Sequence, residues 1–497
     1  MKKLLLATVL AGVLALTQGA DRAVFGAEEE AAITPATVQP RGQYIGFERC
    51  AQCHAQEEVK PGQSRVVDEL GLTDYVSLSE FVIWRAKDKH AEAYKKGLQS
   101  DLGRRILTTL ELSIDDKQCV GCHTTIRNGG IAPLRERVLG VTCEGCHGPG
   151  SGWKDAHADP SWRTKSSREK QQFGMIDMRE PTVRARQCFS CHMGNTQEGK
   201  VVTHKMYAAG HPPLPGIEVE THLRVMPHHW RNLGEKKPEI QRLLRYDLQE
   251  KLSTKSVILG GVLAYRDWLN LLAANSPAKV QAGWTDFALY DCYGCHHDLK
   301  FDARAISWRQ ERGYVGTAGR PPLADWPQAL VKLAIFHVSG KDPETYQKRV
   351  REFSDKAQKV SRTQNPRAFG DSNGAAAGTR DAALDELVTW LNKLAGEVET
   401  SRFDKAETRR LLLRLTVIDG SDDPNTKALL DYSTARQIAW AIRSLYADLT
   451  AGSKDANIET ILNAVDLELP GRRQAETSYD PRLFKEQLGR VAKLLAP

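Results

Sequence analysis

The chain has 497 residues, of which 41% are hydrophobic, 26% charged and 7% aromatic, with 39 Gly and 22 Pro. This composition is that of an ordinary soluble protein and excludes the collagen-like, disordered and polytopic membrane classes, while the length allows two or three domains. The formal net charge of +7, taken alone, would suggest an anionic partner such as nucleic acid.

The N-terminal segment has the pattern of an export signal. Lys2 and Lys3 precede an apolar run over residues 4–16, which small residues follow. This run is short for a membrane span, so we expect residues 1–20 to be a cleaved signal peptide. A retained N-terminal anchor is the alternative, because the cleavage site is not an ideal A-x-A. No other segment is expected to span a membrane, since Arg266 and Asp267 interrupt the next long apolar stretch.

All ten cysteines fall into five C-x-x-C pairs, and a histidine directly follows each pair. C-x-x-C-H is the attachment signature of c-type haem. Two thiols one helical turn apart form thioethers with the haem vinyl groups, and the adjacent imidazole binds the iron as its proximal ligand. The alternatives are disulfides, a thioredoxin-like redox pair and a zinc site, none of which requires a histidine after every pair.

We therefore expect five covalently attached c-type haems. Their propionates make the polypeptide, which carries +5 once Lys2 and Lys3 are removed, near-neutral when oxidised and acidic when reduced. No nucleic-acid partner is then expected. The attachment residues are Cys50, Cys53, Cys119, Cys122, Cys143, Cys146, Cys188, Cys191, Cys292 and Cys295, and the proximal ligands are His54, His123, His147, His192 and His296.

Nine further histidines can supply distal ligands, and a haem that uses none keeps an open iron position. His90, in a helical stretch between the first two motifs, and His157, after a tight turn that follows the third, are predicted ligands. One or two of the five histidines between 204 and 229 are also expected to bind iron, and we select His211 and His229. The others in that group are His204, His222 and His228.

The remaining candidates are weaker. His297 follows a proximal histidine and cannot reach the far side of the same haem, but it could bind a neighbouring one. His337 lies in an apolar helix and is expected to be a hydrogen-bonded core residue. Methionine is the other axial ligand to consider, and it would raise the potential of its haem. The methionines near the motifs are Met193, Met206 and Met226.

Four stretches carry a family pattern, at residues 47–50, 90–93, 119–123 and, most specifically, 140–150 followed by His157. With them, residues 45–230 resemble the tetrahaem cytochrome c-554 family, whose fold is shared in part with hydroxylamine oxidoreductase and the pentahaem nitrite reductases. The nitrite reductases typically bind their catalytic iron through a lysine in place of the motif histidine, whereas all five motifs here end in histidine.

The resemblance implies a ligand set. It makes His157 the distal ligand of the first haem and His90 that of the third, and it gives the fourth haem a histidine downstream of His192. It also implies that the second haem, on His123, is five-coordinate and therefore a candidate open, catalytic site. The surplus of histidines here could close that site.

The rest of the chain is predicted to be helical. Apolar residues at 384–394 and at 438–449 recur with helical spacing, which predicts a small bundle that covers haem edges or, alternatively, docks a redox partner. The fold class is mainly α: a multihaem cytochrome c fold with little β-structure, plus a C-terminal helical bundle. The predicted parts are a signal peptide at 1–20, a flexible lead-in at 21–44, a cytochrome c-554-like tetrahaem domain at 45–230, a helical extension with the fifth haem site at 231–326 and a C-terminal helical domain at 327–497.

The sequence thus predicts an exported, periplasmic pentahaem cytochrome that carries electrons between redox partner proteins, with peripheral association with a membrane respiratory complex as one setting. The alternative is an oxidoreductase that acts on a small nitrogen or sulfur compound at an open haem on His123. A structural subunit whose haems extend a wire within a larger complex is a third hypothesis.

Overall fold

The described part of the chain is almost entirely helical. The computed structural model describes residues 42–56, 76–126, 130–214, 216–244, 247, 249–274, 286–296, 322–324, 326–364, 377–417, 430–450, 455–464 and 479–495. The chain divides into two compact units, Met1–Val38 and Gln39–Pro497, and every described residue lies in the second. Among these residues, β-structure is limited to isolated bridges such as Asn195↔Lys200 and Tyr290↔Leu323, which confirms the predicted mainly-α class.

Short helices and single 3₁₀ turns make up the described chain before residue 244. The helices are α1 (Phe47–His54), α3 (Glu80–Lys87), α4 (Ala93–Gly97), α5 (Asp101–Leu110), α6 (Lys117–His123), α7 (Leu134–Arg137), α8 (Cys143–His147), α9 (Ser167–Gln172), α10 (Pro181–His192), α11 (His204–Ala208), α12 (Val219–Val225) and α13 (Pro238–Leu243). The 3₁₀ turns are η2 (Lys89–Glu92), η3 (Gly150–Gly152), η4 (Ala156–Ala158), η5 (Pro160–Thr164), η6 (Thr196–Glu198) and η7 (Leu233–Glu235).

Longer helices follow. They are α14 (Leu252–Ala274), α16 (Val331–Val338), α17 (Pro343–Gln364), α18 (Ala377–Thr400), α19 (Lys405–Thr416), α20 (Tyr432–Thr450), α21 (Ala456–Ala464) and α22 (Pro481–Leu495). The 3₁₀ turns of this part are η8 (Phe287–Leu289), η9 (Cys292–Gly294) and η10 (Trp326–Gln328).

The first four cysteine motifs each form the C-terminal end of a helix: α1, α6, α8 and α10 all end on the motif histidine. A helical turn places the two cysteines of a motif on one side of the helix, and the histidine follows at the helix end. Local sequence starts these helices: Asp116 caps α6 by accepting from the Gln118 amide at 2.9 Å, and Pro181 opens α10. The fifth motif instead begins with the 3₁₀ turn η9.

A buried carboxylate ties the first motif to the third. Glu144, between the two cysteines of the third motif, is 1% exposed. It accepts hydrogen bonds from the amides of Ile45 (2.9 Å), Gly46 (2.8 Å) and Gly150 (2.7 Å). Gly46, which precedes α1, has a φ of 92°, a conformation that favours glycine. Three bonds to the charged group offset the cost of its burial, so the start of α1 is held against α8.

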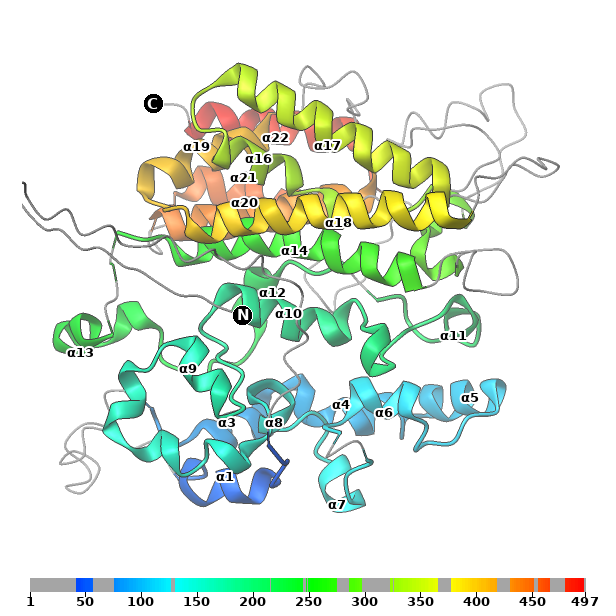
Figure 1. The fold of residues 1–497 in the computed structure, drawn as a ribbon, viewed down its shortest axis with the longest axis vertical. Coiled ribbons are helices and arrows are strands. Elements are labelled where there is room, and N and C mark those ends of the chain that lie inside the picture. Colours follow the sequence, from blue (N-terminus) through cyan, green and yellow to red (C-terminus); the bar gives the residue numbers. More distant parts are fainter. Residues whose placement is uncertain are drawn as a thin grey trace, which may run out of the picture. The chain divides into compact units, whose positions relative to one another are not determined.

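The main hydrophobic core surrounds α14. This helix contacts α10, α16, α18 and α20, and Figure 1 shows the long helices gathered around it. α14 has the length and hydropathy of a membrane span, which differs from our expectation, but 78% of its most apolar window is buried inside the protein. Arg266, which we expected to interrupt the stretch, is itself buried and donates to Asp267 at 2.7 Å. The helix is therefore placed as a core helix.

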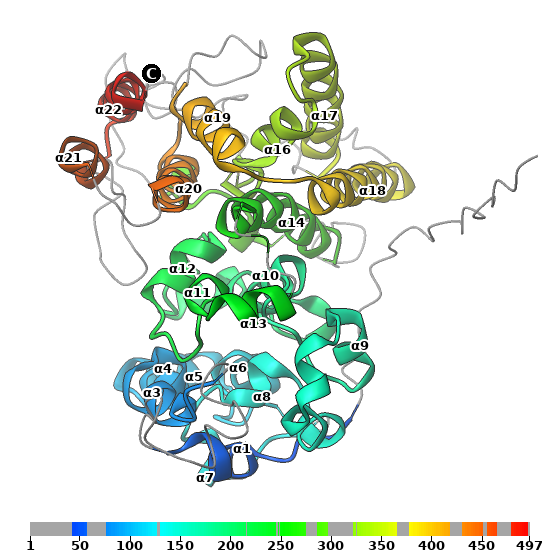
Figure 2. The same cartoon turned by 90° about the vertical axis from the view of Figure 1, so that its left-hand side faces the viewer.

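The predicted C-terminal bundle is confirmed. Leu384, Leu387, Leu391 and Leu394, the stripe on α18, are all at most 1% exposed and belong to the main core. α12 lies against both α14 and α20 (Figure 2), and α14 contacts α10, which carries the fourth motif.

Candidate haem sites

Two motif histidines face a histidine from a distant part of the chain. An imidazole bound to iron through Nε2 at about 2.0 Å has its ring centre about 3.15 Å from the metal, so two opposite ligands lie about 6.3 Å apart, centre to centre. The rings of His54 and His157 are 6.2 Å apart, and those of His123 and His211 are 6.4 Å apart. Both pairs therefore fit a six-coordinate haem iron.

The second ring nitrogen of these histidines is already engaged. In each, Nδ1–H donates to a carbonyl or carboxylate oxygen, which fixes the tautomer and leaves the lone pair on Nε2 for a metal. The acceptors are Glu80 Oε2 for His54 (2.8 Å), Ala93 O for His123 (2.9 Å), Pro212 O for His211 (2.7 Å) and Lys154 O for His157. Burial raises the pKa of Glu80, but the bond to His54, the charge of His54 and the bonds from the Glu80 and Ser77 amides together lower it, so the carboxylate is an acceptor at neutral pH.

Three rings gather at the fourth motif. His192 lies 5.9 Å from His90 and 5.7 Å from His222, and only one of them can lie opposite it on one iron. His222 donates through Nδ1 to Glu218 O at 2.8 Å, and its buried Nε2 has no hydrogen-bond partner among the described residues. A buried imidazole nitrogen without a hydrogen-bond partner is available to bind a metal. His90 donates through Nδ1 to Asp88 at 2.9 Å.

The C-terminal bundle supports His222. The ring of Trp440, on α20, packs edge-on against His222 at 5.6 Å. The buried Glu218 carboxylate accepts from the Thr221 hydroxyl at 2.7 Å and from the Ser444 hydroxyl at 3.0 Å, which ties α12 to α20.

At the third motif, burial together with the nearby His229 and His54 lowers the pKa of His147 to about 4. A neutral imidazole is the form that binds metal. His229 has a buried Nδ1 without a hydrogen-bond partner in the described structure.

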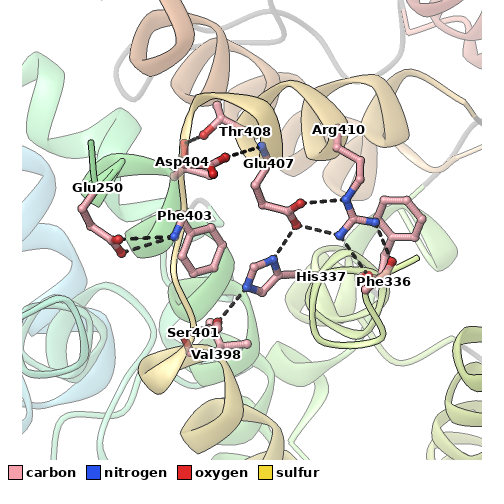
Figure 3. Close-up of polar contacts among 12 residues, drawn as sticks. Glu250, Phe336, His337, Val398, Ser401, Phe403, Asp404, Glu407, Thr408 and Arg410 are labelled. Carbon is pink, nitrogen blue, oxygen red and sulfur yellow. Dashed lines mark hydrogen bonds and ion pairs between the residues drawn. The ribbon is translucent and has the colours of Figure 1, made fainter. Parts of the chain in front are cut away.

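His337 differs from these histidines in that both of its ring nitrogens are occupied (Figure 3). Nδ1 bonds to Glu407 Oε1 at 2.6 Å and Nε2 to Ser401 Oγ at 2.7 Å. The arrangement has the order of a Ser–His–Glu catalytic triad, but the Ser401 hydroxyl donates to Val398 O at 2.8 Å and the imidazole stacks on Phe403 at 4.0 Å. The expectation of a hydrogen-bonded core histidine is confirmed.

The other candidates are placed as follows. His228 is exposed and its ring packs on Trp230 at 4.6 Å. Met193 belongs to the main hydrophobic core. His297 lies outside the described residues.

Cysteines of different motifs lie next to one another. The Cys50 thiol interacts with Cys143, and that of Cys122 with Cys191, and these interactions raise the pKa of Cys50 and of Cys122. The first motif is therefore beside the third, and the second beside the fourth. Thioether formation removes the thiol protons, so these shifts belong to the protein before haem attachment.

Residues 78–148 match the family model described as "Cytochrome c554 and c-prime". This part of the chain is similar to c-type cytochromes of that family. The matched cytochrome segment contains the second and third motifs and His90, whereas the resemblance that we derived from the motifs extends over 45–230. No curated protein and no solved structure matches the chain.

A c-type cytochrome carries covalently bound haem, and the donor set described here fits that cofactor. Among the described residues no group of three or more His, Cys, Asp or Glu side chains could hold a bare metal ion. A haem iron takes four nitrogens from the porphyrin and needs only two protein ligands, which the facing histidine pairs offer.

The sequence did not single out His204 or His222. Both were left among five candidates, because the motif histidines that they face lie 92 residues away for His204 and 30 residues away for His222. The acidic partners Glu80 and Asp88 were also missed. The order Asp88-x-His90 is the one local signal that could have suggested a carboxylate behind a ligand.

Proposed function

We propose that this protein is an exported pentahaem c-type cytochrome that carries electrons between redox partner proteins, with the irons closed by two histidines each. The haems would supply one-electron transfer between the ferric and ferrous states. The facing pairs His54–His157 and His123–His211, with ring separations of 6.2 and 6.4 Å, carry the proposal.

The second site separates the carrier from the enzyme alternative. An oxidoreductase would need a vacant face on the haem of His123, as the family resemblance implies. The His211 ring lies 6.4 Å from that of His123, the separation expected of a distal ligand, and its Nδ1 is bonded to Pro212 O. This observation favours a closed, electron-carrying site.

For the third and fourth sites we propose His229 opposite His147 and His222 opposite His192. The orphaned buried ring nitrogens of His222 and His229 support these assignments. His90, which the resemblance gives to the third haem, lies beside His192 instead and is tested separately.

Intact-mass spectrometry of the mature protein tests the haem number and the export step together. We expect the mass of a chain shortened by about 20 residues plus five haems. The double variant Cys292→Ala, Cys295→Ala should lose one haem. Fewer than five haems in fully matured wild-type protein would reject the pentahaem proposal.

The carrier role is tested by mixing the reduced protein with an oxidised small electron-transfer protein, and separately with nitrite and hydroxylamine. We expect rapid oxidation by the protein partner and no sustained turnover of either small molecule. Sustained turnover would favour the oxidoreductase.

A further inference from the structure

We propose that His204 is the distal ligand of the fifth haem, opposite the motif histidine His296. The inference rests on the proposed function, because it requires the fifth motif to carry a haem. The two rings are 6.3 Å apart and their planes differ by 27°. This separation equals that of two imidazoles on opposite sides of one iron, about 6.3 Å, and it lies between those of the first and second pairs.

A shared carboxylate places His204 beside the segment that leads into the fifth motif. Asp286 Oδ1 accepts from the amide of His204 at 2.8 Å and from that of Ala288 at 2.8 Å. The first bond fixes the start of α11, and the second caps η8. The ring of Phe287, on η8, stands edge-on to the His204 imidazole at 5.7 Å and limits its rotation.

Two backbone hydrogen bonds, around the antiparallel bridge Tyr290↔Leu323, hold the residues that precede the fifth motif. The Asp291 amide donates to Pro322 O at 3.0 Å, and the Ala324 amide donates to Leu289 O at 3.1 Å. Cys292 and Cys295 are exposed, so both thiols are accessible for haem attachment. His296 is thus presented from a fixed turn towards His204.

The alternative distal ligands are less well placed. His297 adjoins His296 in sequence and cannot reach the opposite face of the same haem. His211 already faces His123 at 6.4 Å. His204 is therefore the described histidine that geometry assigns to His296.

With His204 as its distal ligand, the fifth site lies next to the second site. Tyr207, one turn after His204 on α11, has its ring 6.2 Å from that of His211. Tyr207 also interacts electrostatically with Cys292, the first attachment cysteine of the fifth motif. A single tyrosine thus touches the distal ligand of the second site and lies near an attachment cysteine of the fifth, so a haem on His296 continues the array at the second haem.

The test uses the mature, oxidised full-length protein and three variants. Electron paramagnetic resonance gives the spin states, and a redox titration gives the reduction potentials. In His204→Ala we expect all five haems to be attached and one haem equivalent in five to change from low-spin to high-spin. His228→Ala, which removes an exposed histidine that packs on Trp230, is the matched control and should leave every haem low-spin. His204→Met, which offers a sulfur ligand in the same place, should raise the reduction potential of one haem in five.

The outcomes separate this inference from the proposed function. The high-spin signal of His204→Ala should vanish when Cys292→Ala and Cys295→Ala are added, because the haem that lost its ligand is then absent. A high-spin signal that persists in this triple variant, or a His204→Ala protein in which every haem stays low-spin while His204→Met leaves all potentials unchanged, would overturn the assignment of His204. Wild-type protein with four haems would instead reject the pentahaem proposal.

Discussion

The motif region (residues 42–192) and the helical region (residues 252–495) differ in helix length and in the size of their hydrophobic cores. The helical region has helices of up to 24 residues packed around α14 in one hydrophobic core. In the motif region the described helices have at most 12 residues, and the main core includes only its last part, from Ala185 onwards. A second, small cluster there contains Tyr94, Leu98 and Val120.

The difference indicates what fills the interior of the motif region. Short helices with few buried apolar side chains cannot offset the conformational entropy of folding by themselves. With the proposed covalent haems, each of which has a large apolar surface, the missing interior would be filled and the ends of α1, α6, α8 and α10 would be fixed. The helical region also carries the fifth motif, but its long helices pack in a conventional hydrophobic core that does not depend on a cofactor.

The largest effect expected from this comparison is that of withholding haem. In protein made without haem attachment, amide hydrogen exchange in α1–α8 should accelerate by at least about 100-fold, while α14, α18 and α20 keep most of their protection. Hydrogen-exchange mass spectrometry measures both regions in one sample. Equal loss of protection in the two regions would contradict the comparison.

A cavity in the helical core should destabilise the helical region and leave the motif region unaffected. Leu391→Ala, at a fully buried position of α18, is expected to destabilise the helical region by about 2–5 kcal/mol, with the haem absorption spectrum unchanged. Chemical denaturation followed by circular dichroism and by haem absorbance separates the two effects. Leu483→Ala, at a 53% exposed position, is the control and should cost far less.

Two histidine variants test whether the helical region supports a haem ligand of the motif region. His222→Ala should convert one haem in five to high-spin, because it removes the ligand that Trp440 and α20 support. His90→Ala should leave the spin states unchanged. If the two variants exchange these outcomes, His90 is the ligand, and the helical region does not support the fourth site through His222.

The smallest expected effect is a pH dependence within the helical region. Burial raises the pKa of Glu407, but bonds from His337 and Arg410 outweigh this and hold it at about 2, below the ordinary 4.5. The stability that these bonds contribute is complete above about pH 4.5 and is lost as the pH falls towards 2. In Glu407→Gln this part of the acid dependence should be missing, as measured by denaturation at pH 2 to 6; an unchanged profile would exclude Glu407 as its source.

Local patterns in the sequence predicted the helical class, the buried stripe of α18 and the core position of His337, because periodicity and apolar neighbours report burial directly. Which histidine lies opposite each motif histidine was predictable only in part. His157 was selected from the turn before it, but its partner His54 lies 103 residues away, and a separation of this kind is set by the tertiary fold. His204 depends on Asp286, which joins two segments that no spacing rule relates.

The most direct test of the account is low-temperature electron paramagnetic resonance of the oxidised wild-type protein, with and without cyanide. Two histidines on each iron predict five low-spin haems and no change on addition of cyanide. A high-spin signal that cyanide removes, and that His123→Met alters, would show that His211 does not close the second site and would contradict the carrier proposal.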